Sequence, residues 1–545
     1  MSGRDQDVVV LGSGAAGLTA ALAAAEAGAR VALFEKAELL GGTTALSGGT
    51  IWIPGNRAAR EAGIEDSKEK GLEYLASLSM GMILPELAAA LIEGGPEFVD
   101  FVEDSTELEF QLVAGYPDYH PERPGGLAAG GRSIEVSLFS FAGLGEWADR
   151  IAGEPQRLQI KEMPLGGGTG VLADEVLAER ERLRLEGLGR GLVGGLLAAC
   201  LERGVEVATA TRGVRLVTED GVVTGVEIED AAGTRRVAAG AVVLASGGFE
   251  YDPDLVRDFL RGPLTRGIGA PTGTGDGLRM AMRVGAQLGN MREAWWAPVV
   301  SLPGTRRDGG RNGLLTSRER ALPGTIMVNR AGRRFADEAA NYNAFGGAYH
   351  QLDASRFEYV NVPSYLVFGH GVVDRFGVFG GAPGDEAPDW VTRAGSLAEL
   401  AAKLGVDADG LGETVARFNA EAAAGVDPDF GRGESAYDRF PGKRILGLDT
   451  AAATLGPVEG APFYGVEIES SALGTKGGPR TDGEGRVLDV DGVPIRGLYA
   501  AGNVMANPTG MVYGGAGATL AVAGVFGLAA GRAAVTDRAA SPTWS

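Results

Sequence analysis

Side chains that support thiol and metal chemistry are scarce in this sequence. Cys200 is the only cysteine, so no disulfide can form within the chain, and dithiol redox chemistry and thiolate clusters are excluded. The three histidines, His120, His350 and His370, lie far apart in the sequence. Because so few ligands are available, we expect no catalytic metal.

Long hydrophobic runs and an excess of positive charge are also missing. We find no uninterrupted apolar stretch of about 20 residues and therefore expect no transmembrane helix. The apolar run from Val8 to Leu11 is followed by glycines and preceded by no basic segment, so we do not expect a signal peptide. The formal net charge of −21 disfavours nucleic acid and anionic membranes as partners. These features fit a soluble cytoplasmic enzyme.

Glycine is abundant, with 89 residues in a chain of 545. The glycines gather in short motifs rather than in a repeat, which excludes collagen-like and low-complexity sequence. The length suggests two to four structural units at about 150 residues each. Such a chain can bury large cores without covalent staples.

A strand–turn–helix–strand pattern opens the chain. Val8 to Leu11 predicts a buried strand, Leu18 to Ala29 a helix, and Val31 to Glu35 a second strand, which together make a βαβ unit. The turn carries a G-x-G-x-x-G motif, formed by Gly12, Ser13, Gly14, Ala15, Ala16 and Gly17. In this context the motif predicts a dinucleotide site, with the pyrophosphate at the helix N-terminus and Glu35 accepting from a ribose.

Further glycine turns follow other predicted strands. One comes soon after Glu35, another follows the strand Ala241 to Leu244, and a third lies near the C-terminus. Three separated turns of this kind suit a long, extended cofactor. Their small and hydroxyl residues are Gly42, Thr43, Thr44, Ser47, Gly48 and Gly49; Ala245, Ser246 and Gly247; and Gly502 and Asn503.

A second G-x-G-x-x-G match runs from Gly189 to Gly194. The stretch before it, Glu179 to Glu186, is charged and resembles a helix rather than a strand. We therefore predict no second nucleotide site there, and interpret the motif as a loop leading into a helix.

The composition of the sequence changes after about residue 288, where aromatic residues become more frequent. After about residue 465 the pattern of a predicted strand followed by a glycine turn returns. This predicts an α/β protein with a discontinuous, Rossmann-like domain, residues 1–288 and 466–545, interrupted by an α+β domain, residues 289–465. A ligand is expected in the cleft between them. Trp295 and Trp296 are expected to pack this interface or to line an apolar cavity there.

These motifs, with Tyr513-Gly-Gly-Ala-Gly517 near the C-terminus, resemble the FAD-binding family of fumarate reductase and succinate dehydrogenase flavoproteins. Within that family the chain is most similar to the 3-ketosteroid Δ1-dehydrogenases, over nearly its whole length. The resemblance implies FAD, held noncovalently, since no histidine precedes His120 that could bond the flavin. The resemblance also implies further residues that contact the cofactor: Lys36, Asp276, Gly517, Ala518, Thr519 and Leu520.

Two positions separate the ketone enzymes from the dicarboxylate enzymes of this family. The dicarboxylate reductases carry a proton-donating arginine four residues after a glutamate, and here that place, after Glu338, is Tyr342. They also carry a histidine and an arginine near the C-terminus, whereas the segment from Thr509 to Gly517 has neither. A dicarboxylate needs planar cationic forks, so their absence argues against fumarate or succinate.

The resemblance implies the desaturation of a cyclic ketone, either a 3-ketosteroid or a smaller cyclohexanone-type ring. Tyr342 would remove the α-proton, while the Tyr513 hydroxyl and the Gly517 N–H would stabilise the enolate oxygen. A free phenol has a pKa near 10, so a base role for Tyr342 needs a lowered pKa or a proton relay. The flavin would take the β-hydride and pass electrons to an external acceptor, whether a quinone, a dye or O2.

One departure from the ketosteroid dehydrogenases concerns a further tyrosine that they carry shortly after a Leu-Glu-Phe stretch. The aligned place here is Val113 or Ala114. Either Tyr116 or Tyr119 could substitute, and their spacing could equally reflect packing of a loop. An enone reductase of the same fold is an alternative function. A flavoprotein without catalysis is another, but we find no added interaction domain in the sequence that would favour it.

Overall fold

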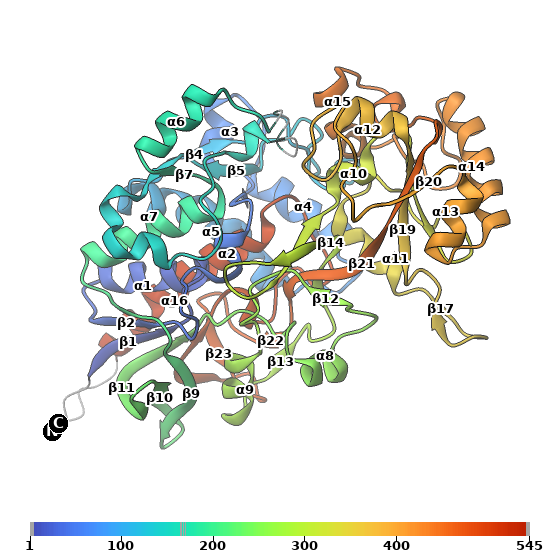
Figure 1. Cartoon of the computed structure of the whole chain (residues 1–545). Helices are drawn as coiled ribbons and strands as arrows, with labels where there is room; N and C mark the ends of the chain where they lie inside the picture. The colour runs from blue at the N-terminus through green and yellow to red at the C-terminus, as the bar shows by residue number, and fades with distance from the viewer. Residues whose placement is uncertain (1–4, 164–165, 167, 169, 541–545) are drawn as a thin grey trace.

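The computed structural model describes residues 5–163, 166, 168 and 170–540. Figure 1 shows two lobes, one with β1, β2, α1 and α7 and the other with β19 and α12 to α14, and the long strands β14 and β21 between them. This arrangement, with a mainly parallel sheet in one lobe and a mainly antiparallel sheet in the other, agrees with the predicted Rossmann-like fold carrying a second, mixed domain.

The first lobe contains an eight-stranded sheet in which β1 pairs with β2 and β11, β2 with β8, and β11 with β24, all in parallel. β1 is buried on both faces, as its continuous apolar sequence predicts. The strands of this sheet are β1 (Gln6–Leu11), β2 (Val31–Phe34), β8 (Glu206–Ala208), β9 (Arg212–Glu219), β10 (Val222–Asp230), β11 (Gly233–Leu244), β23 (Arg486–Leu488) and β24 (Pro494–Ala500).

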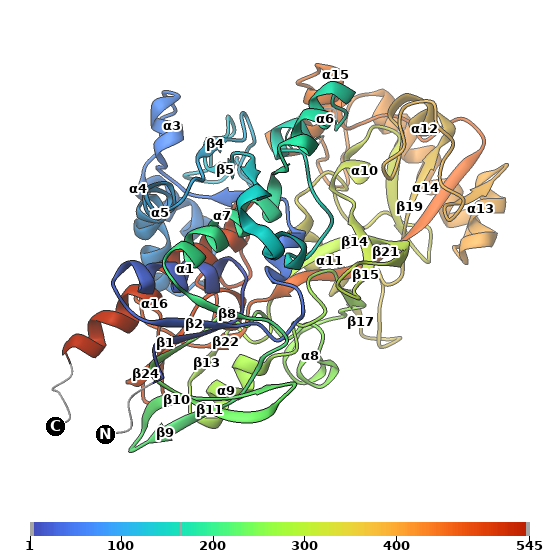
Figure 2. The same cartoon turned by 60° about the vertical axis from the view of Figure 1, so that its left-hand side comes forward.

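Helices α1 (Ala15–Glu26) and α16 (Ala518–Ala540) lie side by side against this sheet (Figure 2). They approach closely because α16 carries glycine at the contact: a Cβ on Gly531 would lie 2.4 Å from the carbonyl oxygen of Ala20. α1 begins three residues before the predicted start and ends three before the predicted end, because the G-x-G-x-x-G turn itself supplies the first turn of the helix.

Helix α16 corrects the expectation about apolar length. Its segment Ala518–Arg538 is long and apolar enough to cross a membrane by length and composition, although 78% of its apolar window is buried inside the protein. The expectation overlooked it because Gly and Thr punctuate the run. Packed against α1, it has the environment of a core helix.

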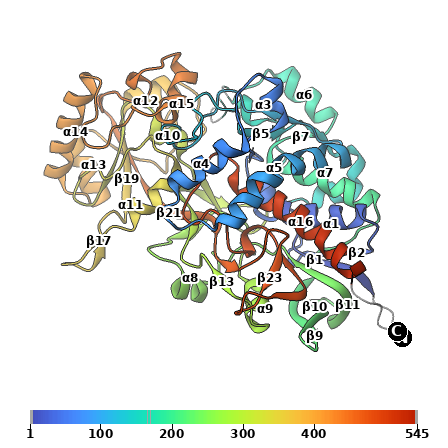
Figure 3. The same ribbon diagram turned by 180° about the vertical axis from the view of Figure 1, so that it is seen from behind.

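A helical layer and a small sheet cover the first lobe. Seen from behind, α4 and α5 lie near α16 (Figure 3). The elements of this layer are α2 (Gly42–Leu46), β3 (Ile51–Trp52), α3 (Arg57–Glu61), α4 (Lys68–Leu78), α5 (Pro85–Ser105), β4 (Phe110–Leu112), β5 (Ser133–Val136), η1 (Phe141–Arg150), α6 (Asp174–Arg182), β7 (Leu185–Glu186) and α7 (Leu188–Glu202). Helices α8 (Pro253–Phe259) and α9 (Asp276–Arg283) lie apart from this layer, with α9 against β9.

The second lobe is built on a seven-stranded sheet that is antiparallel apart from β12. Its strands are β12 (Arg266–Gly267), β14 (Ala294–Thr305), β15 (Arg311–Leu315), β16 (Thr325–Asn329), β19 (Ser364–Gly369), β20 (Thr392–Ala394) and β21 (Phe463–Thr475). Its helices are α10 (Ser317–Ala321), η4 (Tyr342–Ala344), α11 (Phe345–Tyr349), α12 (His370–Phe376), α13 (Leu397–Leu404), α14 (Ala408–Ala423) and α15 (Ala436–Leu446).

The predicted domain limits fall close to this second sheet. Residue 288 lies just before β14, whereas the limit at 465/466 falls inside β21, which continues to Thr475. The division into residues 1–288 with 466–545 and residues 289–465 stays a prediction. The sheet places the ends of β14 and β21 next to the first lobe, where the candidate site forms.

Candidate active site

The turn between β1 and α1 is closed by its glycines. Gly12 has φ +110°, and a Cβ there would lie 2.4 Å from the carbonyl oxygen of Ala245. A Cβ on Gly17 would lie 1.9 Å from the carbonyl oxygen of Gly12. The backbone therefore folds tightly enough for an anion to approach the N-terminus of α1.

Glu35 ends β2 beside this turn. Its Oε2 accepts hydrogen bonds from the backbone N–H of Ser13, at 3.1 Å, and from the Ser13 hydroxyl, at 2.7 Å. Next to it, Lys36 forms an ion pair with Asp276, at 2.6 Å, at the start of α9. Lys36 and Asp276, which are both predicted to contact the cofactor, are thus linked directly.

Hydroxyl residues of the second glycine turn join this groove. Thr44 Oγ1 accepts from the N–H of Ala15 at 3.0 Å, and Thr43 Oγ1 accepts from the N–H of Ala270 at 2.9 Å. The Ser47 hydroxyl donates to the Thr44 carbonyl at 2.7 Å. Gly42, Gly48 and Gly49 complete this turn around α2, with Gly49 at φ +66°.

The remaining cofactor positions come from two other strand ends, those of β11 and β24, and from the start of α16. The Ser246 hydroxyl accepts from the N–H of Gly277 at 3.2 Å, beside Gly247, which has φ +76°. A Cβ on Gly502 would lie 2.9 Å from Ala16 Cβ, and one on Gly517 would lie 2.3 Å from the Thr50 carbonyl oxygen. Asn503 follows β24, and Ala518, Thr519 and Leu520 form the first turn of α16. These contacts bring the predicted cofactor positions together at the ends of β1, β2, β11 and β24 and at the start of α16.

The predicted tyrosines meet in one buried cluster. The ring centroid of Tyr119 lies 5.4 Å from that of Tyr342 and 5.2 Å from that of Tyr513, and the last two are 5.5 Å apart. Tyr342 comes from η4, Tyr513 from the turn before α16, and Tyr119 from the loop after β4. Three distant segments therefore bring their phenols to one point between the two lobes.

Tyr513 and Gly517, the predicted oxyanion pair, lie next to each other. The Tyr513 hydroxyl receives a hydrogen bond from the Thr519 hydroxyl at 2.9 Å and is hydrogen-bonded to the backbone of Gly517. The phenol and the Gly517 N–H are therefore neighbours, and an oxyanion role requires this N–H to donate to a substrate oxygen in place of the phenol oxygen. Burial raises the pKa of Tyr513, so the hydroxyl stays protonated and can donate.

Tyr342 is a neutral phenol in this setting. Burial and then the neighbouring Tyr513 raise its pKa well above the ordinary value of 10, while a hydrogen bond with Tyr119 lowers it in part. A neutral phenol can accept a proton only if it gives up its own. The lowered pKa considered as one route to a base role is absent, and a proton relay is the other.

Tyr116 packs against other aromatic rings rather than against Tyr342. Its ring packs 4.9 Å from Phe440 and 6.4 Å from Tyr437, and Tyr437 in turn lies 5.1 Å from Tyr119. Val113, the aligned position, is buried in the same cluster. Both candidate tyrosines join the cluster, and only Tyr119 contacts Tyr342 and Tyr513.

Sequence reasoning missed Tyr437, Phe440 and Lys476. Tyr437 and Phe440 sit on α15, more than 300 residues after Tyr116, and no local motif marks them. Lys476 is completely buried, and its Nζ donates to the carbonyls of Gly510, at 3.0 Å, and Val512, at 2.7 Å. It thereby holds the turn that carries Tyr513.

The two tryptophans have different surroundings. Trp295 packs 4.6 Å from Tyr513, and its indole N–H donates to Asn503 Oδ1 at 3.0 Å, so it joins the cluster to the cofactor groove. Trp296 points elsewhere, with its ring 4.5 Å from that of His350.

The second G-x-G-x-x-G match has a packing role. Residues 189–194 lie inside α7 rather than in a loop before it, which corrects the predicted start of that helix. A Cβ on Gly189 would lie 1.8 Å from the Thr44 carbonyl oxygen, and one on Gly194 would lie 2.8 Å from the Phe141 ring. These glycines let α7 approach α2 and η1.

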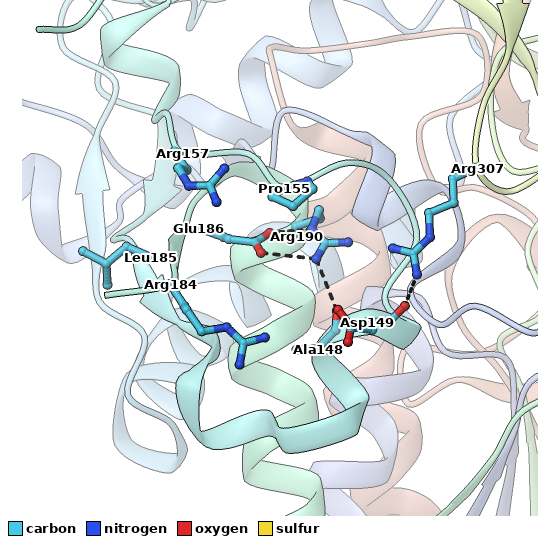
Figure 4. Close-up of a pocket in the computed structure, with 9 residues that line it drawn as sticks. All are labelled: Ala148, Asp149, Pro155, Arg157, Arg184, Leu185, Glu186, Arg190 and Arg307. Atoms are coloured by element: carbon cyan, nitrogen blue, oxygen red, sulfur yellow. Dashed lines mark hydrogen bonds and ion pairs between the residues drawn. The ribbon is translucent and has the colours of Figure 1, made fainter. Parts of the chain in front are cut away.

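A cavity of about 170 Å³ lies away from the tyrosines, between η1 and the start of α7 (Figure 4). Its buried guanidinium, Arg190, is paired with Glu186 and also donates to the carbonyls of Ile151 and Ala152. The residues that line the cavity are Ala148, Asp149, Pro155, Arg157, Arg184, Leu185, Glu186, Arg190 and Arg307.

Within the described ranges, one trio of carboxylates is close enough to share a cation: Glu421, Asp427 and Asp429. Arg417 pairs with Glu421 and Asp429, and Arg334 pairs with Asp427. Each carboxylate of this trio therefore already has an arginine as its partner.

The groove fits FAD by the chemistry of its donors. The N-terminus of α1 faces it without a side chain at Gly14, a carboxylate stands at the end of β2, and glycines line four strand ends. Parallel sheets of this kind bind ligands at the carboxyl ends of their strands. The first turn of α16 contacts Tyr513 through Thr519. A cofactor that extends from the start of α1 to the start of α16 would therefore end beside the tyrosine cluster.

Comparisons with known proteins agree with this geometry. Residues 7–520 match the family model described as FAD binding domain. The chain is 45% identical over 536 residues to the 4-oxocyclohexanecarboxylate 2-dehydrogenase of Sinomonas cyclohexanicum, covering 96% of this chain and 92% of that one. It is 39% identical over 565 residues to a 3-oxosteroid 1-dehydrogenase of Mycobacterium tuberculosis, covering 97% and 98%.

A solved structure is similar along its full length. The crystal structure of the 3-ketosteroid Δ1-dehydrogenase from Sterolibacterium denitrificans, in complex with 1,4-androstadiene-3,17-dione, aligns with a TM-score of 0.87 at 33% identity, covering 98% of this chain and 100% of that one. A flavocytochrome c3 fumarate reductase shares the fold at 22% identity, with a TM-score of 0.63. This chain belongs to the FAD-binding flavoprotein family and is an FAD-dependent oxidoreductase similar to the 3-ketosteroid Δ1-dehydrogenases.

Proposed function

We propose that this enzyme desaturates a cyclic ketone by removing one hydrogen from the carbon α to the carbonyl and one from the β-carbon. The observation that carries the proposal is the meeting of Tyr342, Tyr513 and the Gly517 N–H in one buried, largely apolar site. Bound FAD supplies the hydride acceptor for such a reaction.

Each residue of the cluster has a separate role in the proposed reaction. The Tyr513 hydroxyl and the Gly517 N–H would hold the carbonyl oxygen and stabilise its enolate character. Tyr342, 5.5 Å from Tyr513 between ring centroids, would receive the α-proton. Tyr119 contacts both rings and orients them, while Trp295 covers Tyr513 from the second lobe.

Substrate size defines two candidates. The similarity to 3-oxosteroid 1-dehydrogenases favours a 3-ketosteroid. A single-ring oxo compound is favoured by the 45% identical 4-oxocyclohexanecarboxylate 2-dehydrogenase and by the aromatic packing of Tyr116, Tyr437 and Phe440 at one end of the cluster. Those rings would limit the length of a substrate that is held at Tyr513.

Electrons would leave the reduced cofactor directly for an external acceptor, such as a quinone, a dye or O2. With Cys200 as its one cysteine, the chain offers no thiolate cluster that could relay them. We place the enzyme in the cytoplasm on the strength of its acidic composition.

Flavin reduction without oxygen tests the proposal. The yellow holoenzyme is mixed anaerobically with 4-androstene-3,17-dione, cyclohexanone or 4-oxocyclohexanecarboxylate, and flavin absorbance is followed. Bleaching by at least one ketone is expected, and the fastest one identifies the size class. No bleaching by any of them, with fast oxidation of the reduced enzyme by the matching enones, would replace desaturation by enone reduction.

A further inference from the structure

Two neighbours of the active-site tyrosines contact each other between the two lobes. His120 follows Tyr119 in the loop after β4, and Asn341 precedes Tyr342 at the start of η4. The amide nitrogen Nδ2 of Asn341 lies 3.0 Å from the imidazole Nε2 of His120, and it also donates to the Tyr119 carbonyl at 3.5 Å. One amide group therefore joins the segments that carry two of the clustered phenols.

The orientation of this amide decides which atom donates in the contact. Asn341 is the N-cap residue of η4, and its Oδ1 accepts a hydrogen bond from the N–H of Ala344 at 3.1 Å. Because the amide oxygen caps the helix, the NH2 group is the part that faces His120. An NH2 group only donates, so the imidazole Nε2 must accept, and His120 is neutral with its hydrogen on Nδ1.

The same loop is also held to the segment of the third phenol. The Tyr119 N–H donates to the carbonyl of Gly514 at 3.0 Å, one residue after Tyr513. The hydroxyl of Tyr74, on α4, donates to that carbonyl at 2.7 Å and accepts from the backbone N–H of His120 at 3.0 Å. The backbone of this loop is thus fixed against the turn that carries the oxyanion phenol, and its histidine side chain makes the further contact to η4.

We propose that His120 is a positioning residue for the desaturation: in its neutral form it accepts the hydrogen bond of Asn341 and holds Tyr342 against the other two phenols. This inference rests on the proposed function, because it concerns the alignment of the same phenols. Protonation of His120 would place an N–H against the Asn341 NH2 group. Two donors would then face each other, the contact would be lost, and η4 would no longer be tied to the loop through this ring.

The groups that face His120 come from several segments. Glu122 and Arg123 lie on its own loop, where the carboxylate of Glu122 is 3.7 Å from Nδ1 and the Arg123 N–H donates to the His120 carbonyl at 3.1 Å. Tyr74 on α4 and Asn341 before η4 are its uncharged partners. Because the carboxylate attracts the hydrogen to Nδ1, the Nε2 that faces Asn341 is the atom that gains a proton as the pH falls.

The pH dependence of kcat tests the positioning role. With the ketone that bleaches the flavin fastest, wild-type kcat should fall roughly tenfold on the acid side as His120 gains its second proton, with FAD content unchanged. His120→Gln places an amide oxygen near the position of Nε2, so it should keep the alkaline kcat and lose this fall. His120→Leu offers no acceptor and should show the low kcat at every pH.

His370→Gln is the matched control. His370 is an exposed histidine at the start of α12, and its Nδ1 lies 3.5 Å from the Tyr464 hydroxyl, away from the tyrosine cluster. Its replacement should leave both kcat and the pH profile at the wild-type level. An acid-side fall that persists undiminished in His120→Gln, or a wild-type alkaline kcat in His120→Leu, would overturn the positioning role.

Nitrogen NMR of the holoenzyme tests the contact without turnover. In protein with isotope-labelled histidine rings, the His120 signals are those that disappear in His120→Gln. At alkaline pH the wild type should show a hydrogen on Nδ1 and none on Nε2. Asn341→Asp keeps an N-cap oxygen and replaces the donor by an acceptor, so Nε2 should stay protonated to higher pH than in the wild type.

These NMR outcomes separate the positioning role from the proposed function. A hydrogen on Nε2 in the alkaline wild type, or an unchanged titration in Asn341→Asp, would end the proposal for His120 even if no ketone bleaches the flavin. The expected hydrogen positions without bleaching would fault only the proposed function.

Discussion

The ammonium nitrogen of Lys476 lies 3.9 Å from the centroid of the Trp295 ring, and that ring packs 4.6 Å from Tyr513. A lysine without any exposed surface thus supports the oxyanion phenol from two directions, through the tryptophan and through the carbonyls of Gly510 and Val512. Burial lowers the pKa of Lys476 to about 7.

The stability of the protein should depend on the charge of Lys476. The unfolded chain would hold this pKa near its ordinary value of about 10.4, so between about pH 7 and pH 10 the unfolded state binds a proton that the folded state does not. Stability contributed by this site therefore rises with pH across that window and is lost as the pH falls toward 7. Urea unfolding of the wild type and of Lys476→Met at both ends of the window measures it. A gap between the two proteins that does not move with pH would contradict the depressed pKa.

Removing the hydroxyl of Tyr342 should abolish most turnover. We expect Tyr342→Phe to lower kcat by roughly 10²–10⁴, since it removes the group that receives the α-proton. The ring contacts with Tyr119 and Tyr513 persist, so FAD should stay bound, which the flavin absorbance of the purified variant checks. Turnover near that of the wild type would remove Tyr342 from the mechanism.

Tyr513→Phe tests the oxyanion site. Loss of one preorganised donor should cost roughly 10²–10³ in kcat. Because the Gly517 N–H remains, some stabilisation of the enolate oxygen should survive. Single-turnover flavin reduction measures the chemical step directly, and a loss confined to KM would show that Tyr513 serves binding alone.

The turn between β1 and α1 should tolerate no added side chain. In Gly17→Ala the new Cβ would meet the Gly12 carbonyl oxygen at 1.9 Å, so we expect a protein that fails to hold FAD or to fold stably. Gly412→Ala is the matched control, because it lies inside α14 with no atom within 4 Å of the new Cβ. That change should stabilise the protein by about 0.5–1 kcal/mol through helix propensity. Flavin content and thermal unfolding compare the two.

Glu338 anchors the segment that leads to Tyr342. It is completely buried between Arg334, at 2.7 Å, and Arg432, at 3.1 Å. Glu338→Gln leaves the buried guanidinium of Arg432 without its carboxylate, while Arg334 keeps Asp427, and should cost about 3–5 kcal/mol of stability.

An exposed ion pair on the same lobe controls for the loss of one carboxylate. Glu413 pairs with Arg333 at 2.7 Å, with both side chains more than half exposed. Glu413→Gln should change the free energy of unfolding by less than about 1 kcal/mol. If both variants lose the same free energy of unfolding, the buried ion pairs of Glu338 stabilise the protein no more than an exposed pair does.

Local sequence was enough to predict the strand–turn–helix unit at the start of the chain. A strand, a G-x-G-x-x-G turn and a helix are contiguous from residue 6 to residue 26, so the physical reason for each glycine is visible within one turn. The positions of Tyr342 and Tyr513 were found through the resemblance to a family, because no local pattern distinguishes an active-site phenol from a core one.

The amino-acid sequence by itself determined the chemistry that is available: no thiolate cluster, a glycine-lined dinucleotide turn, and phenols where dicarboxylate enzymes carry cations. Only the tertiary structure decided which aromatic residues meet, because ring contacts between residues 116, 119, 342, 437 and 513 depend on the docking of two lobes. It also decided the burial of Lys476 beside them, and burial, which no linear pattern encodes, is what shifts its pKa and the pKa values of the phenols.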